Sequence, residues 1–240
     1  MDNSKPAEHH PALLSAEQLE HLFGKRRSVR AFLPDAVPEA ELDAILRAAA
    51  RSPSGNNIQP WRVHVLTGTV RDKLVEEVCA AFDRQDGQHR SEYHYYPQQF
   101  FEPYLARRRR NGWSLYGLLG IPKGDRAASH AQHRRNFMFF DAPVGLMFTI
   151  DRRLELGSWL DYGMFLQSIM LAAVARGLAT CPQAAWIDYH QIISSQLGFA
   201  PHEQLVCGMA VGYEDLSALV NSFETERADL AEFVVRHGAE

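Results

Sequence analysis

Cysteine is scarce in this chain of 240 residues, and no two cysteines form a C-x-x-C pair. The three that occur are Cys79, Cys181 and Cys207, and their wide separation argues against a disulfide framework and against a thiolate zinc site. A reduced, cytoplasmic environment is therefore expected. A surplus of positive charge is missing too, because the formal net charge is −4. General nucleic-acid binding, which needs a clear excess of lysine and arginine, is not expected.

Long uninterrupted apolar runs are also missing. Residues 1–20 contain no basic stretch followed by an apolar one, so no secretory signal is expected. The most apolar segment, residues 158–178, is interrupted by Asp161, Gln167 and Ser168. It predicts a core helix, or a helix buried partly against a second subunit, and no membrane span.

Three familiar sequence signatures do not occur. The chain has no G-x-G-x-x-G, no G-x-x-x-x-G-K-[ST] and no G-x-S-x-G. A Rossmann fingerprint, a P-loop and a nucleophile elbow are therefore unsupported. His130 and His133 have a spacing that metal ligands use, but no acidic or thiolate residue completes the pattern, so no metal site is predicted.

The chain does contain alternating helical and extended patterns. Apolar residues recur at helical spacing over 38–49, before Pro53, and again over 71–82. Strands are predicted within "WRVHVLTG" and over the apolar runs at 144–150 and 205–213. With 46% hydrophobic residues the chain is able to bury a substantial core. We expect an α+β fold around one sheet, with residues 1–240 forming one domain.

Residues 84–140 differ from the rest of the chain. They are dense in aromatic residues, arginine and proline without clear periodicity, which favours an excursion that caps a site or a partner. The arginines at 107–110 are interpreted as a solvated face, with recognition of a substrate carboxylate as the second interpretation. Trp113 and Tyr116 are interpreted as packing residues, with the wall of a substrate pocket as the alternative.

Two short segments concentrate polar side chains. "KRRSVRAF" places Arg26, Arg27 and Arg30 close to Ser28, and guanidinium forks of this kind match the oxygens of a phosphate monoester. A solvated basic turn is the alternative. "RSPSGNNIQPWRV" (51–63) links a helix to a strand through a loop rich in serine, asparagine and glycine.

The order of four motifs resembles the FMN-dependent nitroreductase superfamily over nearly the whole chain. These motifs are "KRRSVRAF", "SPSGNNIQPWRV", "GLATCPQAAW" and "NSFETER". "YHYYP", "FEPYLARRR" and "SWLDYGMFLQ" make the nitrobenzoate and nitroaromatic reductases the nearest branch. The resemblance implies a nitroreductase fold, with a central, mostly antiparallel sheet flanked by helices, in an intertwined homodimer.

The resemblance also implies how FMN is held. The positions that match the family's phosphate contacts are Arg26, Ser28 and Arg227, with Arg27 beside the ribityl chain and Arg30 at the N1–C2=O edge of the ring. Negative charge accumulates at that edge on reduction, and a fixed guanidinium would stabilise it. Thr225 stands where some relatives have a lysine, so Arg227 is expected to carry more of the phosphate binding.

Two further segments match positions around the flavin ring. Pro53 and Ser54 correspond to residues along the flavin, and Asn56 to one near its exposed face. The segment covering the other face, whose backbone N–H groups bond N5 and O4, is Pro182, Gln183, Ala184 and Ala185. A glutamate is common in some branches at the position of Ala184.

The implied activity is two-electron, alternating transfer from NADH or NADPH through FMN to a nitroaromatic acceptor. No side chain is expected to be the acid or base, because the cofactor carries the chemistry. A sibling flavin reductase, acting on activated alkenes, quinones or halogenated substrates, would share the same flavin contacts. A non-enzymatic flavin-binding protein is the remaining alternative.

Overall fold

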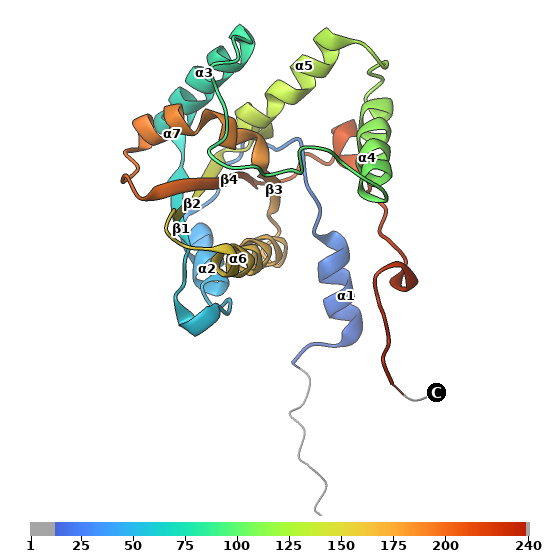
Figure 1. Ribbon diagram of the computed structural model, residues 1–240. Helices are drawn as coiled ribbons and strands as arrows, with labels where there is room; N and C mark the ends of the chain where they lie inside the picture. Colours follow the sequence, from blue (N-terminus) through green and yellow to red (C-terminus); the bar gives the residue numbers. More distant parts are fainter. Residues whose placement is uncertain (1–12, 239–240) are drawn as a thin grey trace, which may run out of the picture.

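The computed structural model describes residues 13–238, organised around a four-stranded antiparallel sheet in the order β1-β2-β4-β3 (Figure 1). The strands are β1 (Arg62–Leu66), β2 (Val144–Asp151), β3 (Ala179–Gln183) and β4 (Glu203–Gly212). The expected α+β class with a mostly antiparallel sheet is confirmed. The expectation of no secretory signal concerns a segment that lies largely outside the described residues.

Helices lie on both faces of the sheet. They are α1 (Ala16–Lys25), α2 (Glu39–Ala49), α3 (Gly68–Arg84), α4 (Tyr104–Leu118), α5 (Arg126–Arg134), α6 (Leu156–Val174) and α7 (His190–Leu197). In Figure 1, α3, α5 and α7 lie above the sheet, while α2 and α6 lie below it. The helices on each face cover a separate cluster of buried apolar residues. Residues of α3 belong to one cluster, and residues of α2 and α6 belong to the other.

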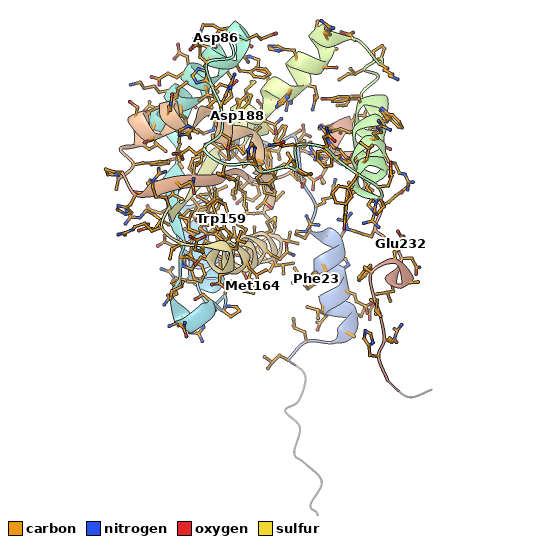
Figure 2. The ribbon with its side chains drawn as sticks, in the orientation of Figure 1. Phe23, Asp86, Trp159, Met164, Asp188 and Glu232 are labelled. Carbon is orange, nitrogen blue, oxygen red and sulfur yellow. The ribbon has the colours of Figure 1, made fainter. Side chains whose placement is uncertain are left out.

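Helix α6 departs from its prediction in two ways. It ends at Val174 instead of 178, because Gly177 adopts a left-handed φ of 73°. Its inner face buries aromatic residues such as Tyr162, but its outer face leaves Leu160 72% exposed and Met164 at the surface (Figure 2). The helix is therefore only partly buried within one chain. No helix in residues 13–238 is long and apolar enough to cross a membrane.

The end of the predicted excursion is core and not cap. Residues 135–141 form a tight turn that buries Phe137, Phe139 and Phe140. Phe139 stacks on Trp186 with 4.5 Å between ring centroids. Phe139 and Phe140 have left-handed φ values near 50°, so their side chains follow neither helical nor strand periodicity. The spacing of apolar residues in the sequence therefore did not predict that this turn is buried. Two helices, α4 and α5, make up a little under half of residues 84–134.

Glu203 fastens the beginning of β4 to the neighbouring strands. Its carboxylate is 5% exposed, and it accepts hydrogen bonds from Thr149 Oγ1 at 2.7 Å and from the Ala200 N–H at 3.0 Å. His64 Nε2 lies 2.9 Å from the same carboxylate. Burial acts to raise the pKa of Glu203, but these hydrogen bonds outweigh it and lower the pKa to about 2.

We expect acid to weaken the fold through Glu203. The pKa falls from 4.5 in the unfolded chain to about 2 in the fold, so the carboxylate stabilises the fold above pH 4.5. That contribution is lost as the pH falls toward 2, and it amounts to about 3 kcal/mol at most. Urea unfolding at pH 7 and pH 3 measures it. The Glu203→Gln variant should lose less stability between these pH values, and an equal loss in both proteins would contradict the assignment.

Candidate functional site

The segment after α1 runs along the edge of the sheet at β3. The Val29 N–H donates to the Thr180 carbonyl at 3.1 Å, and Ser28 forms a parallel bridge to Thr180. Phe32 bridges to Glu214, just beyond β4. This backbone pairing fixes residues 28–32, and with them the basic side chains that the sequence places there.

Arg26 and Arg227 come together from opposite ends of the described chain. Arg26 ends α1 and is half buried, and burial lowers its pKa, with the nearby charge of Arg227 lowering it further. Neither guanidinium has an ion-pair partner among residues 13–238. Two like charges held together without a carboxylate form a site that favours an anion.

Thr225 orients Arg227. Arg227 Nη1 donates to Thr225 Oγ1 at 2.5 Å and to the Glu226 carbonyl at 2.9 Å. The Glu226 carboxylate itself is occupied by Arg110, at 2.6 Å, so it does not neutralise Arg227. Thr225 therefore contributes a hydroxyl that holds the Arg227 guanidinium in place.

Arg30 is fixed by both its backbone and its side chain. Its N–H donates to Asn221 Oδ1 at 2.8 Å, and its Nη1 donates to the Ser28 carbonyl at 3.2 Å. The guanidinium lies 5.9 Å from the centroid of Phe223. The Cys181 thiol lies beside Arg30 and Ser28, and burial raises its pKa to about 11. Arg27 forms an ion pair with Glu214.

A cavity of about 720 Å³ has the 182–185 segment in its wall. Gln183 is buried there, with Nε2 donating to the Asn136 carbonyl at 2.6 Å and Oε1 accepting from Trp186 Nε1 at 3.3 Å. These bonds join the end of β3 to the turn after α5. The polar and aromatic side chains opposite come from residues 90–96 and include Arg90, Tyr93, Tyr95 and Tyr96.

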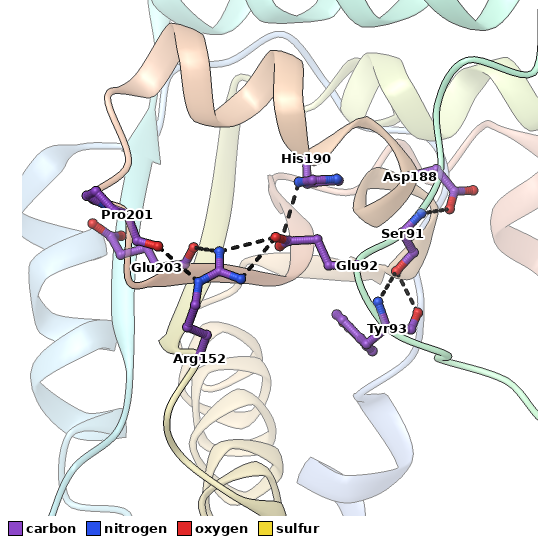
Figure 3. A network of polar contacts seen from close by, with 8 residues as sticks. All are labelled: Ser91, Glu92, Tyr93, Arg152, Asp188, His190, Pro201 and Glu203. Atoms are coloured by element: carbon purple, nitrogen blue, oxygen red, sulfur yellow. Dashed lines mark hydrogen bonds and ion pairs between the residues drawn. The ribbon is translucent and has the colours of Figure 1, made fainter.

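Long-range hydrogen bonds hold the 90–96 wall in place (Figure 3). Arg152 donates to Glu92 Oε1 at 3.1 Å and to the Pro201 carbonyl at 2.9 Å. The Ser91 N–H donates to Asp188 Oδ1 at 3.0 Å, and the Tyr93 hydroxyl donates to the Val206 carbonyl at 2.7 Å. The wall is thus tied to the sheet although its own residues form neither helix nor strand.

Several residues of this region were not singled out by the sequence. Arg90 lines the cavity and has no ion-pair partner among residues 13–238. Asn136 lines it as well, and Tyr95 and Tyr96 meet edge to face at 4.7 Å. Thr180 Oγ1 is buried without a hydrogen-bond partner. "YHYYP" was the available signal for the tyrosines, but no local pattern marked Arg90 or Asn136.

The 53–59 loop lies elsewhere. It is attached to α6, because the Gly55 N–H donates to Asp161 Oδ2 at 3.0 Å. The Gln59 N–H donates to Ser54 Oγ at 3.0 Å, and Asn56 has a left-handed φ of 50°. In Figure 1 the loop follows α2 at the bottom of the molecule, away from the end of α1. One chain therefore does not bring Pro53, Ser54 and Asn56 to the Arg26–Arg227 pair.

The arginine run on α4 is divided between two faces of the helix. Arg107 pairs with Glu232 at 2.9 Å, and Arg110 pairs with Glu226, so this face holds the C-terminal segment. A cavity of about 350 Å³ between them includes Arg227 in its wall. Arg108 instead stacks over Phe100, 4.5 Å from the ring centroid. The interpretation of 107–110 as a solvated face agrees with the exposure of Arg107 (46%) and Arg110 (64%), but these two side chains also form ion pairs with the C-terminal segment.

His130 has a packing and pairing role. Its Nε2 lies 3.0 Å from Asp83 Oδ1, and its ring stacks on Phe82 at 4.3 Å. Within residues 13–238, no group of three histidine, cysteine or acidic residues is arranged to hold a metal ion.

Comparison with known proteins gives extensive matches. Residues 24–213 match the Nitroreductase family. A chloronitrobenzene nitroreductase from Comamonas testosteroni is 40% identical over 215 residues, covering 90% of this chain and 95% of that protein. A 4-nitrobenzoate reductase from Pseudomonas putida is 38% identical over 214 residues, covering 89% and 93%.

Among solved structures, the FMN-dependent nitroreductase NfnB from Mycobacterium smegmatis, in complex with NADPH, has the same fold. It superposes with a TM-score of 0.89 at 33% identity, covering 93% of this chain and 99% of that one. The likeness therefore extends over the sheet, its helices and the segments between them.

Proposed function

Because the chain belongs to the nitroreductase family, we propose that it is an FMN-dependent NAD(P)H oxidoreductase that reduces nitroaromatic compounds by alternating two-electron transfer. The observation that carries this proposal is the Arg26–Arg227 pair, which has no ion-pair partner among residues 13–238. Arg26 lies two residues before Ser28, which pairs with Thr180 on β3, and β3 leads into the 182–185 wall. We propose further that residues 1–240 act as one domain, in which 84–134 forms the cap, and that the protein works in the cytoplasm.

The residues present fit FMN. Arg26, Ser28 and Arg227 supply charge and a hydroxyl for the phosphate, and the unpartnered Thr180 hydroxyl lies beside Ser28 on the paired strand. Residues 182–185 would form a wall beside the ring, and Gln183, Ala184 and Ala185 have backbone N–H groups to offer it. Held by these residues, FMN would supply the redox chemistry, with NAD(P)H as hydride donor and the nitro group as two-electron acceptor.

In this proposal the protein holds the reactants in position and supplies fixed charges around the flavin. Arg30 is held by the Ser28 carbonyl and by Asn221, so its charge is fixed before negative charge develops at the pyrimidine edge. Arg27, neutralised by Glu214, supports the strand beside the ribityl chain. The tyrosines at 95 and 96 offer edges and faces to a flat aromatic acceptor. No side chain is assigned as acid or base.

A homodimer completes the site in this proposal. The 53–56 loop, which matches flavin-facing positions of the family, lies away from the phosphate arginines of its own chain. Apolar side chains stay exposed on three separate elements: Phe23 on α1, Leu160 on α6 and Phe233 in the C-terminal segment. A second copy would bury these surfaces and bring its loop to the flavin.

The direct test of the activity is flavin colour. The purified protein should be yellow, bleach within seconds of adding NADH or NADPH, and regain its colour with a nitroarene. Bleaching without reoxidation by any nitroarene, combined with turnover of quinones or activated alkenes, would assign it to the sibling reductases. A yellow protein that neither nicotinamide bleaches would be a flavin-binding protein and not this enzyme.

Loss of Arg227 should loosen FMN. A charge-assisted hydrogen bond to phosphate contributes roughly 1.5–3 kcal/mol, so Arg227→Ala should lower FMN affinity about ten- to a hundredfold. Equilibrium titration of the apoprotein with FMN measures this affinity. Arg47→Ala, at an exposed position on α2, is the matched control. Wild-type affinity in Arg227→Ala would show that the C-terminal motif is misassigned.

Arg90 should favour a nitroarene that carries a carboxylate. Arg90 lines the cavity and has no ion-pair partner among residues 13–238, whereas Arg107 and Arg110 are paired with glutamates. Arg90→Gln should raise the KM for 4-nitrobenzoate about tenfold while nitrobenzene is unaffected, and the preference should fade as salt is raised. Arg84→Gln, just upstream and paired with Asp86, is the control. Equal rates on both substrates at every ionic strength would remove the carboxylate claim.

A further inference from the structure

A second cleft, of about 900 Å³, lies along the face of α4 turned away from Arg227. Residues 107, 110 and 114 line the cavity that contains Arg227, whereas residues 105, 109, 112 and 116 line this cleft. At 3.6 residues per turn these two sets fall on opposite sides of the helix. The far wall of the cleft is the connection at 121–124.

The cleft is cationic without compensating acid. Its walls contain Arg108, Arg109 and Lys123, and no acidic side chain is among the residues that line it. Arg109 and Lys123 have no ion-pair partner within residues 13–238. The other face of the same helix differs sharply, because there Arg107 and Arg110 are neutralised by glutamates. Unpaired cations gathered in one cleft favour a ligand with several negative charges.

The same cleft exposes aromatic rings. Trp113 is 62% exposed, which is unusual for so large an apolar side chain, and Tyr116 lies one turn further along the same wall. Arg108 is held flat over Phe100 at the edge of the cleft. A flat base stacks on such rings, while phosphates bind the neighbouring guanidinium and ammonium groups. Rings and cations together fit a phosphorylated purine nucleoside better than a simple anion.

We propose that this cleft binds the adenosine 2′-phosphate end of NADPH. The inference rests on the proposed function, in which NAD(P)H reduces the bound flavin. Helix α4 is about 10–12 Å across with its side chains, so Arg227 on one face and the cleft on the other are separated by roughly the thickness of one helix. In this proposal the adenosine end occupies the cleft and the nicotinamide end extends past α4 toward the flavin. NADH lacks the 2′-phosphate, so the unpaired cations select NADPH.

Direct binding tests this assignment without turnover. Isothermal titration of the FMN-loaded protein with 2′,5′-ADP and with 5′-AMP compares ligands that differ only in the 2′-phosphate. Arg109→Gln and Lys123→Gln should each weaken 2′,5′-ADP at least tenfold and change 5′-AMP far less. Arg126→Gln removes a nearby positive charge that does not line the cleft, and it should bind both ligands as wild type does. Quenching of Trp113 fluorescence by 2′,5′-ADP, absent in Trp113→Phe, locates the site.

Unchanged 2′,5′-ADP affinity in both Arg109→Gln and Lys123→Gln would overturn the inference. So would equal affinity of the wild type for 2′,5′-ADP and 5′-AMP. Stopped-flow bleaching separates this failure from failure of the proposed function. If NADH and NADPH bleach the flavin equally fast, and the variants bleach at the same rates, the cleft does not bind the 2′-phosphate, while the proposed enzymatic function stands. If neither nucleotide bleaches the flavin, the proposed enzymatic function is itself contradicted.

Discussion

The repulsion between Arg26 and Arg227 is the constraint on which the rest of the site depends. Folding brings these two cations together, and burial of Arg26, with the nearby charge of Arg227 as the second cause, lowers the pKa of Arg26. Such an arrangement destabilises the folded protein when no ligand is bound, and it becomes favourable when an anion binds both guanidinium groups. We propose that this anion is the phosphate of FMN. Cofactor binding and the stability of the chain ends should therefore be linked.

Helix α4 connects this phosphate site to the outer surface. Its inner face holds the C-terminal segment through Glu226 and Glu232, and so fixes the backbone that carries Arg227. Its outer face keeps Arg109 unpaired. A single run of arginines thus serves two purposes: one pair has structural partners, and the other side of the helix remains available to a ligand. Because both ion pairs are exposed, each contributes little to the free energy of unfolding.

The spacing of apolar residues predicted the helices and strands in which one face, or the whole element, is buried. Helices α2 and α3 and strands β1, β2 and β4 were predicted because apolar residues recur along them at the spacing of their own element. Strand β3 was missed because it contains Pro182, and a proline argues against a strand within a sheet. Helix α4 was missed because its arginines and exposed Trp113 leave no buried stripe to recognise.

The candidate site was less accessible to sequence reasoning. The polar clusters at 26–30 and 53–56 were visible as residue types, and the roles given to their residues remain predictions. Arg90 and Asn136 could not be found, because their places depend on distant bonds such as Arg152 to Glu92 and Gln183 to Asn136. The division of the arginine run likewise depends on carboxylates more than a hundred residues away. Pairing across such distances leaves no local pattern.

The central claim is that two copies supply complementary halves of each flavin site, and subunit mixing tests it most directly. One copy carries Arg26→Ala and Arg227→Ala, the other carries Ser54→Trp, and heterodimers are purified through two different tags. Each parent homodimer should lack tightly bound FMN. The heterodimer should regain one FMN, because one of its two sites combines intact arginines with an intact loop from the other chain. A heterodimer as empty as its parents, or a Ser54→Trp homodimer that keeps its full complement of FMN, would contradict the account.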